Sequence, residues 1–205
     1  QRVSIEGDIT YYDAGRRLAV AQDDTSAIAV AVPPGISFRA HQRVRISGVL
    51  PPGHDPNAPT PLALDDVQFT TVRNQIPPPA RRASITEFVA GSEPVRFEIA
   101  GIVKAVREQN GRVHLEVTGE GASVTALVKY ASFARLSGLV DARVSLRGVR
   151  FVAATPAPSW MILLTDASDI TVIDVPPANP AQVASLRALF EPRLIESGHR
   201  IRVRG

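Results

Sequence analysis

Hydrophobic and polar residues alternate with a period of two along much of the chain, which is the pattern of half-buried β-strands. In residues 1–75 the alternation predicts four strands at 18–21, 28–32, 43–49 and 62–72, all following a long first strand. In that first strand the apolar row is Val3, Ile5, Ile9 and Tyr11, and the outward row is Arg2, Ser4, Glu6, Asp8 and Thr10. Asp, Gly and Pro residues separate the strands as turns require. Residues 1–75 therefore predict one five-stranded module.

The same order of elements returns in residues 94–175. Strands are expected at 95–106, 113–117, 123–128 and 142–149, with a short helix at 131–136 and a last strand after Asp166 and Asp169. The opening phrase around Gly7 recurs around Gly101, and a third copy begins in residues 198–205 and reaches Gly205. The copies are about one small domain apart, so the chain is interpreted as two whole modules and the start of a truncated third.

Two proline-rich connections separate these modules, at residues 76–93 and 176–197. In the first, Ser84 and Glu87 have the spacing of a capping box, which predicts a helix start. In the second, Asn179 and Pro180 predict an N-cap and a first helical residue, followed by an apolar stripe that includes Val183. Each helix is expected either to pack on a barrel and fix the angle between neighbours, or to cover an exposed strand edge.

Together these patterns predict an all-β fold with minor α content. The expected architecture is two tandem five-stranded OB-like Greek-key barrels joined by Pro-rich and helical linkers, because five strands with a small helix or loop between strands three and four are typical of that barrel. Gly7 and Gly101 fall on the inward row of a long first strand, where a missing side chain allows a bend or a bulge.

Residues 18–30, Leu-Ala-Val-Ala-Gln-Asp-Asp-Thr-Ser-Ala-Ile-Ala-Val, resemble the strand, Gln-Asp, glycine-rich turn and strand of bacterial OB-like modules. Asp24 and Ser26-Ala27 replace the usual glycines, and the second module lacks the Gln-Asp pair. The tandem modules, the Pro-Pro linkers and the restart at 198–205 resemble the N-terminal extracytoplasmic sensory regions of bacterial sensor proteins of the histidine kinase or diguanylate cyclase type. The resemblance implies a periplasmic sensory or ligand-docking fragment of a membrane-anchored protein with a kinase or cyclase output domain, and it identifies no ligand.

Composition narrows the classes of protein only slightly. The chain is 44% hydrophobic and 21% charged, which is typical of a folded protein, and no apolar run is long enough to span a membrane. The isoelectric point is near 9.8, but all except two of the 23 basic residues are arginine and the formal net charge is only +3. The absence of cysteine excludes disulfides and thiolate metal sites.

No motif in the sequence indicates a reaction. There is no Gly-x-Ser-x-Gly elbow, no phosphate-binding loop and no dinucleotide fingerprint. The four histidines, His41, His54, His114 and His199, share no metal-ligand spacing and are interpreted as solvated surface residues. The sequence therefore predicts a protein without catalytic residues, metal or cofactor.

Two kinds of binding site are compatible with the pattern. Rows of outward arginines favour a single-stranded nucleic-acid surface, but few aromatic residues accompany them, and Glu6, Glu98 and Glu116 are placed to form cross-strand ion pairs with arginines. The other site is a groove between the barrels for an unknown small molecule or protein, with Tyr12, Arg43, Arg45, Tyr130 and Trp160 as candidate residues. The hypothesis is a non-catalytic sensory fragment that relays binding through inter-barrel geometry; the alternatives are a nucleic-acid-binding module and a structural spacer.

Overall fold

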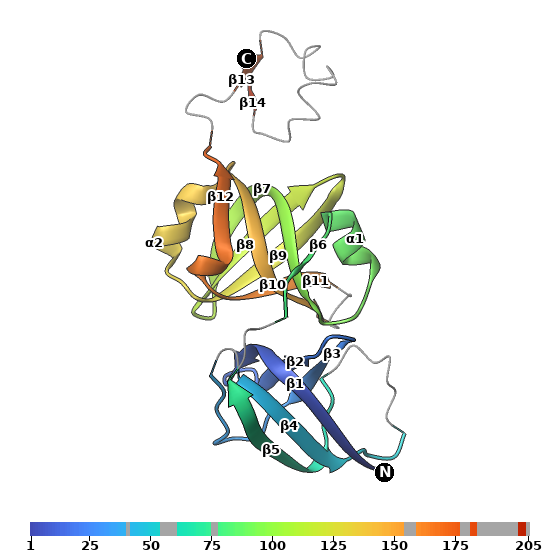
Figure 1. The fold of residues 1–205 in the computed structure, drawn as a ribbon. Helices are drawn as coiled ribbons and strands as arrows, with labels where there is room; N and C mark the ends of the chain where they lie inside the picture. Colours follow the sequence, from blue (N-terminus) through green and yellow to red (C-terminus); the bar gives the residue numbers. More distant parts are fainter. Residues whose placement is uncertain are drawn as a thin grey trace.

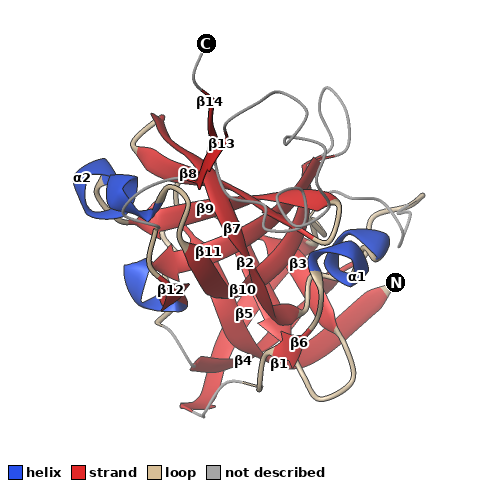
Figure 2. Ribbon diagram, turned by 90° about the horizontal axis from the view of Figure 1, so that it is seen from above, coloured by secondary structure: helices blue, strands red, loops and turns tan. Residues whose placement is uncertain are grey.

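A computed structural model describes residues 1–39, 42–53, 61–74, 78–153, 159–176, 181–183 and 201–203. Strands dominate these ranges and helices are few and short, so the all-β prediction with minor α content is confirmed. The strands form two barrels, one above the other in Figure 1, with the helices at the periphery in Figure 2. None of the helices in these ranges combines the length and the apolar character needed to cross a membrane.

The first barrel is a five-stranded antiparallel sheet in the order β3-β2-β1-β4-β5. Its strands are β1 (Arg2–Asp13), β2 (Leu18–Gln22), β3 (Ala27–Ala31), β4 (Gln42–Val49) and β5 (Asp65–Asn74). A single parallel bridge from Val30 to Leu62 brings the two ends of the sheet together. The strand predicted at 62–72 is therefore divided: Leu62 lies against β3, and the strand that pairs with β4 begins at Asp65.

The second barrel is closed. Its strands are β7 (Arg96–Gln109), β8 (Arg112–Gly119), β9 (Ala122–Tyr130), β10 (Arg143–Ala153) and β11 (Ser159–Asp166). β7 pairs with β8, β8 with β9, β9 in parallel with β11, β11 with β10, and β10 again with β7, which is the strand order of an OB barrel. Two short strands extend it: β12 (Ile170–Asp174) pairs with β10, and β6 (Arg81–Arg82) pairs in parallel with β7.

Short helices cover the second barrel. They are α1 (Ile85–Ala90), α2 (Phe133–Leu136) and the 3-10 turns η1 (Ser137–Leu139) and η2 (Ala167–Asp169). The capping box predicted from Ser84 and Glu87 is present, and both of its hydrogen bonds form. Ile85 and Phe88 are buried in the core of the second barrel, so the helix of the first connection packs on that barrel.

The side chain of Arg150 holds this helix against the barrel through hydrogen bonds. This side chain is buried, and the guanidinium donates to the carbonyl oxygens of Phe88 at 3.0 Å and Glu93 at 2.7 Å. It also lies 4.7 Å from the ring centroid of Phe97, within the range of a cation–π contact. Backbone carbonyls and an aromatic face thus stabilise this buried charge, together with the electrostatic effect of the Glu93 carboxylate.

The two barrels repeat each other down to the strand register. Gly7 is paired with Val44 in the first barrel, and Gly101 is paired with Val144 in the second. Both glycines lie where a neighbouring strand passes closely. A Cβ atom on Gly7 would be 3.1 Å from the backbone nitrogen of Gln22, and one on Gly101 would be 2.7 Å from a methyl group of Val117. The recurring glycine is therefore explained by close strand packing in the bent first strand.

A β-bulge follows each of these glycines by three residues. The register shifts between Ile9 and Tyr11 in β1, and between Val103 and Ala105 in β7. A bulge adds one residue to a strand and reverses its alternation beyond that point. The single inward row predicted for the first strand is therefore wrong at its end: Ile9 lies in the core of the first barrel, whereas Tyr11 is buried against the second barrel.

The outward rows carry the ion pairs that the sequence favoured. Arg43 and Arg45 contact Glu6 at 3.0 and 3.1 Å. The prediction that Asp8 faces solvent is wrong, because its side chain is buried and its carboxylate accepts from Arg43 at 3.1 Å. The same guanidinium contacts Glu6, so it covers two neighbouring carboxylates on β1.

The second connection differs from its predicted form. Ala181–Val183 is a strand, β13, and not a helical turn; it pairs in parallel with β14 (Ile201–Val203) in the third copy of the repeated phrase. Backbone pairing with another chain segment outweighs the weak local preference for a helix. Asn179, Pro180 and the remainder of the predicted apolar stripe lie outside the described residues.

An apolar cluster joins the two barrels. Tyr11, Leu18 and Val20 of the first barrel pack against Leu127, Val149, Met161 and Leu163 of the second. All seven side chains are buried, and partly buried apolar residues of β3 and β10 pack against them. We call this contact the junction. Because it buries a continuous apolar surface on both sides, it holds the barrels as one unit.

Polar contacts at the junction are specific and partly buried. The carboxylate of Asp13, which is 1% exposed, accepts from the guanidinium of Arg112 at 2.7 Å. The side-chain oxygen of Gln22 accepts from the backbone nitrogen of Arg96 at 2.8 Å. Lys129 Nζ donates to the carbonyl oxygen of Tyr12, also at 2.8 Å. Each bond joins one barrel to the other. The relative orientation of the barrels is therefore set by directional hydrogen bonds as well as by apolar burial.

Gly101→Ala is expected to lower the free energy of unfolding by about 1–3 kcal/mol, because the new methyl group would overlap Val117 and the backbone of Thr118. Urea denaturation would measure the change. Gly138→Ala is the matched control, since a Cβ at Gly138 meets no atom within 4 Å. Equal stabilities of the two variants would contradict the packing explanation.

Asp13→Asn is expected to cost about 3 kcal/mol of stability, because it leaves the largely buried guanidinium of Arg112 without its counter-charge. Glu116→Gln breaks the exposed pair with Arg107, in which the nearest atoms are 3.7 Å apart, and should cost less than about 1 kcal/mol. Chemical denaturation of both variants checks this order. A loss of the same size in the two would show that the Asp13 pair does not stabilise the junction.

Candidate functional site

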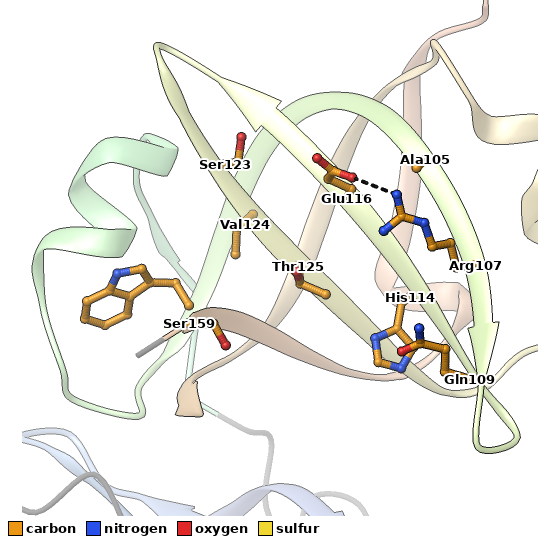
Figure 3. Close-up of a pocket in the computed structure, with 10 residues that line it drawn as sticks. Ala105, Arg107, Gln109, His114, Glu116, Ser123, Val124, Thr125 and Ser159 are labelled. Atoms are coloured by element: carbon orange, nitrogen blue, oxygen red, sulfur yellow. Dashed lines mark ion pairs between the residues drawn. The ribbon is translucent and has the colours of Figure 1, made fainter. Parts of the chain in front are cut away.

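The second barrel carries an open groove of about 560 Å³ on the face formed by β7, β8 and β9 (Figure 3). It is lined by Ala105, Arg107 and Gln109 of β7, His114 and Glu116 of β8, Ser123, Val124 and Thr125 of β9, and Ser159 and Trp160 of β11. Most of these side chains are polar, and strand alternation turns them away from the barrel core. We call this site the groove.

The centre of the groove contains paired charges and hydrogen-bonding groups. Glu116 contacts Arg107 at 3.7 Å across the β7–β8 pair, as the dashed line in Figure 3 shows. His114 is directly opposite Arg107, and Thr125 is directly opposite Glu116. The face therefore offers a carboxylate, a guanidinium, an imidazole and a hydroxyl within one small area.

His114 connects the groove with the junction. Burial lowers the pKa of its imidazole below 6.5, and the positive charges of Arg16 and Arg112 lower it further. Arg16 belongs to the first barrel, and Arg112 is the residue that binds Asp13 across the junction. One side chain of the groove therefore lies within electrostatic reach of the junction.

The first barrel has a counterpart to this face, and there it is buried. Its members are mostly apolar and three of them, Tyr11, Leu18 and Val20, form the first barrel's side of the junction. The strand register shows which cross-strand pairs are equivalent in the two barrels. The pair Tyr11–Val20 corresponds to Ala105–Glu116, and the pair Asp13–Leu18 corresponds to Arg107–His114. The pair Val20–Ala29 corresponds to Glu116–Thr125. The same face of the repeat is thus an apolar docking surface in one copy and an open polar groove in the other.

A second cavity, of about 310 Å³, lies between the barrels. The first barrel contributes the end of β1 and Phe38, and the second contributes Arg96, Lys129, Tyr130, Arg147 and the turn around η2. Both barrels supply its walls, and we call it the cleft.

The candidate residues from the sequence fall in three places. Tyr12 and Tyr130 line the cleft, and Trp160 lines the groove. Tyr12 also packs on its own barrel: its hydroxyl donates to Ile36 at 2.6 Å, and its ring meets Phe38 edge to face. Arg43 and Arg45 line neither cavity, because they extend from β4 and bind the carboxylates of β1.

The sequence interpretation missed most of the charged residues of both cavities. The sequence pattern places His114 on the solvated surface and gives no signal for Lys129. A comparison of the two modules at equal register would have found the groove, since apolar residues of the first module stand where polar residues stand in the second. His41, His54 and His199 lie outside the described residues. Within the described ranges, no group of three or more His, Asp or Glu side chains could hold a metal ion.

Comparison with known proteins adds little. No protein-family model matches the chain, and no curated protein matches it. Among solved structures it is similar to an aspartyl tRNA synthetase from Entamoeba histolytica, with 17% sequence identity and a TM-score of 0.40. That match covers 49% of this chain and 22% of the synthetase chain.

The pKa of His114 provides a test of the groove's position. Arg16→Met is expected to raise this pKa toward 6.5, because it removes a positive charge that disfavours the imidazolium. In the unaltered protein the lowered pKa means that the unfolded chain binds a proton first. Stability should therefore fall as the pH drops through 6.5, and the loss should be complete below the folded-state pKa.

NMR titration of the His114 ring would measure the midpoint, and thermal denaturation between pH 8 and 5 would follow stability. Arg45→Met is the control, since Arg45 does not contribute to the shift. An unchanged midpoint in Arg16→Met would mean that Arg16 does not act on His114.

Proposed function

We propose that this chain is a non-catalytic, ligand- or partner-binding fragment of a bacterial signal-transduction protein, with the groove of the second barrel as its binding face. One observation carries the proposal. The equivalent face of the first barrel binds a neighbour, while in the second barrel the face is open and polar. A surface that already serves for binding in one copy of a repeat is a good candidate for binding in the other.

The chemistry of the groove favours a polar, reversibly bound partner. Permanent burial would remove the charges of Arg107 and Glu116 from water at a cost in free energy. A buried ion pair recovers this desolvation cost only with excellent geometry. A hydrated ligand can exchange hydrogen bonds with these groups and with His114 and Thr125 at little cost. This differs from the first barrel, whose apolar face is suited to a permanent neighbour.

Signal transmission through inter-barrel geometry is part of the proposal. His114 faces the groove, and Arg112, two residues earlier on β8, holds Asp13 of the first barrel. A ligand that displaces or neutralises charge at His114 therefore acts next to the main polar contact of the junction. A ligand that prefers one position of this contact shifts the population toward it. The assignment to an extracytoplasmic sensory region rests on the sequence resemblance.

Thr125→Arg tests the site, because the long side chain would fill the centre of the groove. Thr70→Arg on β5 is the matched control, since Thr70 is exposed and lies outside the groove. Saturation-transfer NMR against sugars, amino acids, nucleotides and short peptides should find ligands that bind the unaltered protein and the control but not Thr125→Arg. Small-angle scattering of the ligand-bound protein should then show a change in barrel geometry.

Fluorescence anisotropy with labelled single-stranded oligonucleotides at low and high salt forms a second arm. Steep weakening of binding at high salt would instead indicate a nucleic-acid-binding protein. Absence of any ligand from both arms, or equal binding by Thr125→Arg, would contradict the proposal and favour a structural spacer.

A further inference from the structure

The cleft between the barrels has a surplus of positive charge and of hydrogen-bond donors. Arg96, Lys129 and Arg147 line it, against the carboxylates of Asp166 and Asp169. Its volume of about 310 Å³ is that of a small-molecule site. The groove has a separate set of residues, so the cleft is a second and independent cavity.

The two carboxylates are already satisfied by their own turn. Asp166 accepts from the backbone nitrogen and the hydroxyl of Ser168 at 2.7 and 2.6 Å, and these bonds lower its pKa. Asp169 accepts from the backbone nitrogen of Thr165 at 2.8 Å. Burial raises the pKa of Asp169. The oxygens of both carboxylates are therefore engaged by donors of their own turn, while the cations that line the cleft outnumber the carboxylates.

The basic side chains, in contrast, have N–H donors that are available for a ligand. The ammonium of Lys129 has three donors, and one of them bonds to the carbonyl oxygen of Tyr12. Arg147 uses its Nε to bind Glu98 at 3.0 Å, which leaves its terminal nitrogens for another acceptor. Arg96 reaches the carbonyl oxygen of Pro78 only at 3.5 Å.

Aromatic rings flank the same ammonium group. Lys129 Nζ lies 4.3 Å from the ring centroid of Tyr130 and 5.3 Å from that of Tyr12. Tyr130 lines the cleft and is 63% exposed, so much of its ring surface is available for contact. The cleft thus combines cations in its wall with a flat apolar surface.

We propose that the cleft binds a small ligand through its carboxylate or phosphate oxygens, with Lys129 and Arg147 as the groups that bind the anion and Tyr130 as the surface that contacts the rest of the ligand. Anionic oxygens complete the free donors of both residues with charge-assisted hydrogen bonds, which are the strong class. The ring of Tyr130 favours a ligand with a planar or apolar portion.

Binding at this position also reaches the junction. Lys129 is bonded to the backbone of Tyr12, immediately before Asp13, the residue that pairs with Arg112. An anion that draws the ammonium toward itself competes with this carbonyl bond. Ligand binding in the cleft is therefore coupled to the contact between the barrels, and this coupling does not involve the groove.

Isothermal titration calorimetry with inorganic phosphate, phenyl phosphate and benzoate tests the proposal. Phosphate alone and benzoate distinguish the two kinds of anion, and phenyl phosphate measures the contribution of the ring. Lys129→Met and Arg147→Met are each expected to weaken binding of the best probe about tenfold or more, the usual effect of losing a charge-assisted hydrogen bond.

Arg45→Met is a close control for Arg147→Met. Arg45 is 55% exposed and Arg147 is 53% exposed, and each binds a glutamate of the neighbouring strand at about the same distance. Arg45 lies outside the cleft, so its replacement should change affinity less than twofold. NMR spectra of the unaltered protein should show amide shifts at Tyr12 and Asp13 on addition of the probe.

The outcomes separate clearly. Weakening by Arg147→Met but not by Arg45→Met supports the site, even if Lys129→Met should prove unstable. Absence of binding by all three probes, or equal weakening by the two arginine variants, overturns it. Thr125→Arg in the groove should leave anion binding unchanged, so this result and the proposed function of the groove can fail separately.

Discussion

The apolar face at the end of β1 and on β2 is the constraint on which the rest of the structure depends. Tyr11, Leu18 and Val20 would form a contiguous exposed patch on an isolated first barrel, and such patches are unfavourable in water. The second barrel removes this patch by packing its own apolar side chains against it. The position of the cleft and the proximity of the groove to the junction both follow from this one contact.

The two barrels show how one repeated unit can serve two purposes with little change of backbone. Strand order, glycine positions and bulges are shared, since they determine how the sheet curves. Side chains on the outer face of these strands, which point away from the core of their own barrel, differ: Leu18 corresponds to His114 and Val20 to Glu116. Function is therefore to be sought in the residues that differ between the copies, while the residues that recur maintain the fold.

Much of the fold could be predicted from the sequence because it depends on local pattern. Alternation gave the strands, and the Ser84–Glu87 spacing gave the start of α1. The junction could not be predicted in the same way. Asp13 and Arg112 are far apart in sequence, and neither lies in a recognisable motif. Of the candidate residues, Tyr12 and Tyr130 line the cleft between the barrels, whereas Arg43 and Arg45 form the cross-strand ion pairs that the sequence pattern also favoured.

The bulge in β1 has a wider consequence for how this chain tolerates change. Upstream of Thr10 the strand supplies side chains to its own barrel, and Tyr11 beyond it faces the neighbouring one. A single extra residue thus allows one continuous strand to place apolar side chains in two hydrophobic environments. Deleting that residue would exchange the environments of Tyr11 and Tyr12 without altering either side chain. At this position the number of residues, and not their identity, determines which side chains face each barrel, so no substitution could compensate for the deletion.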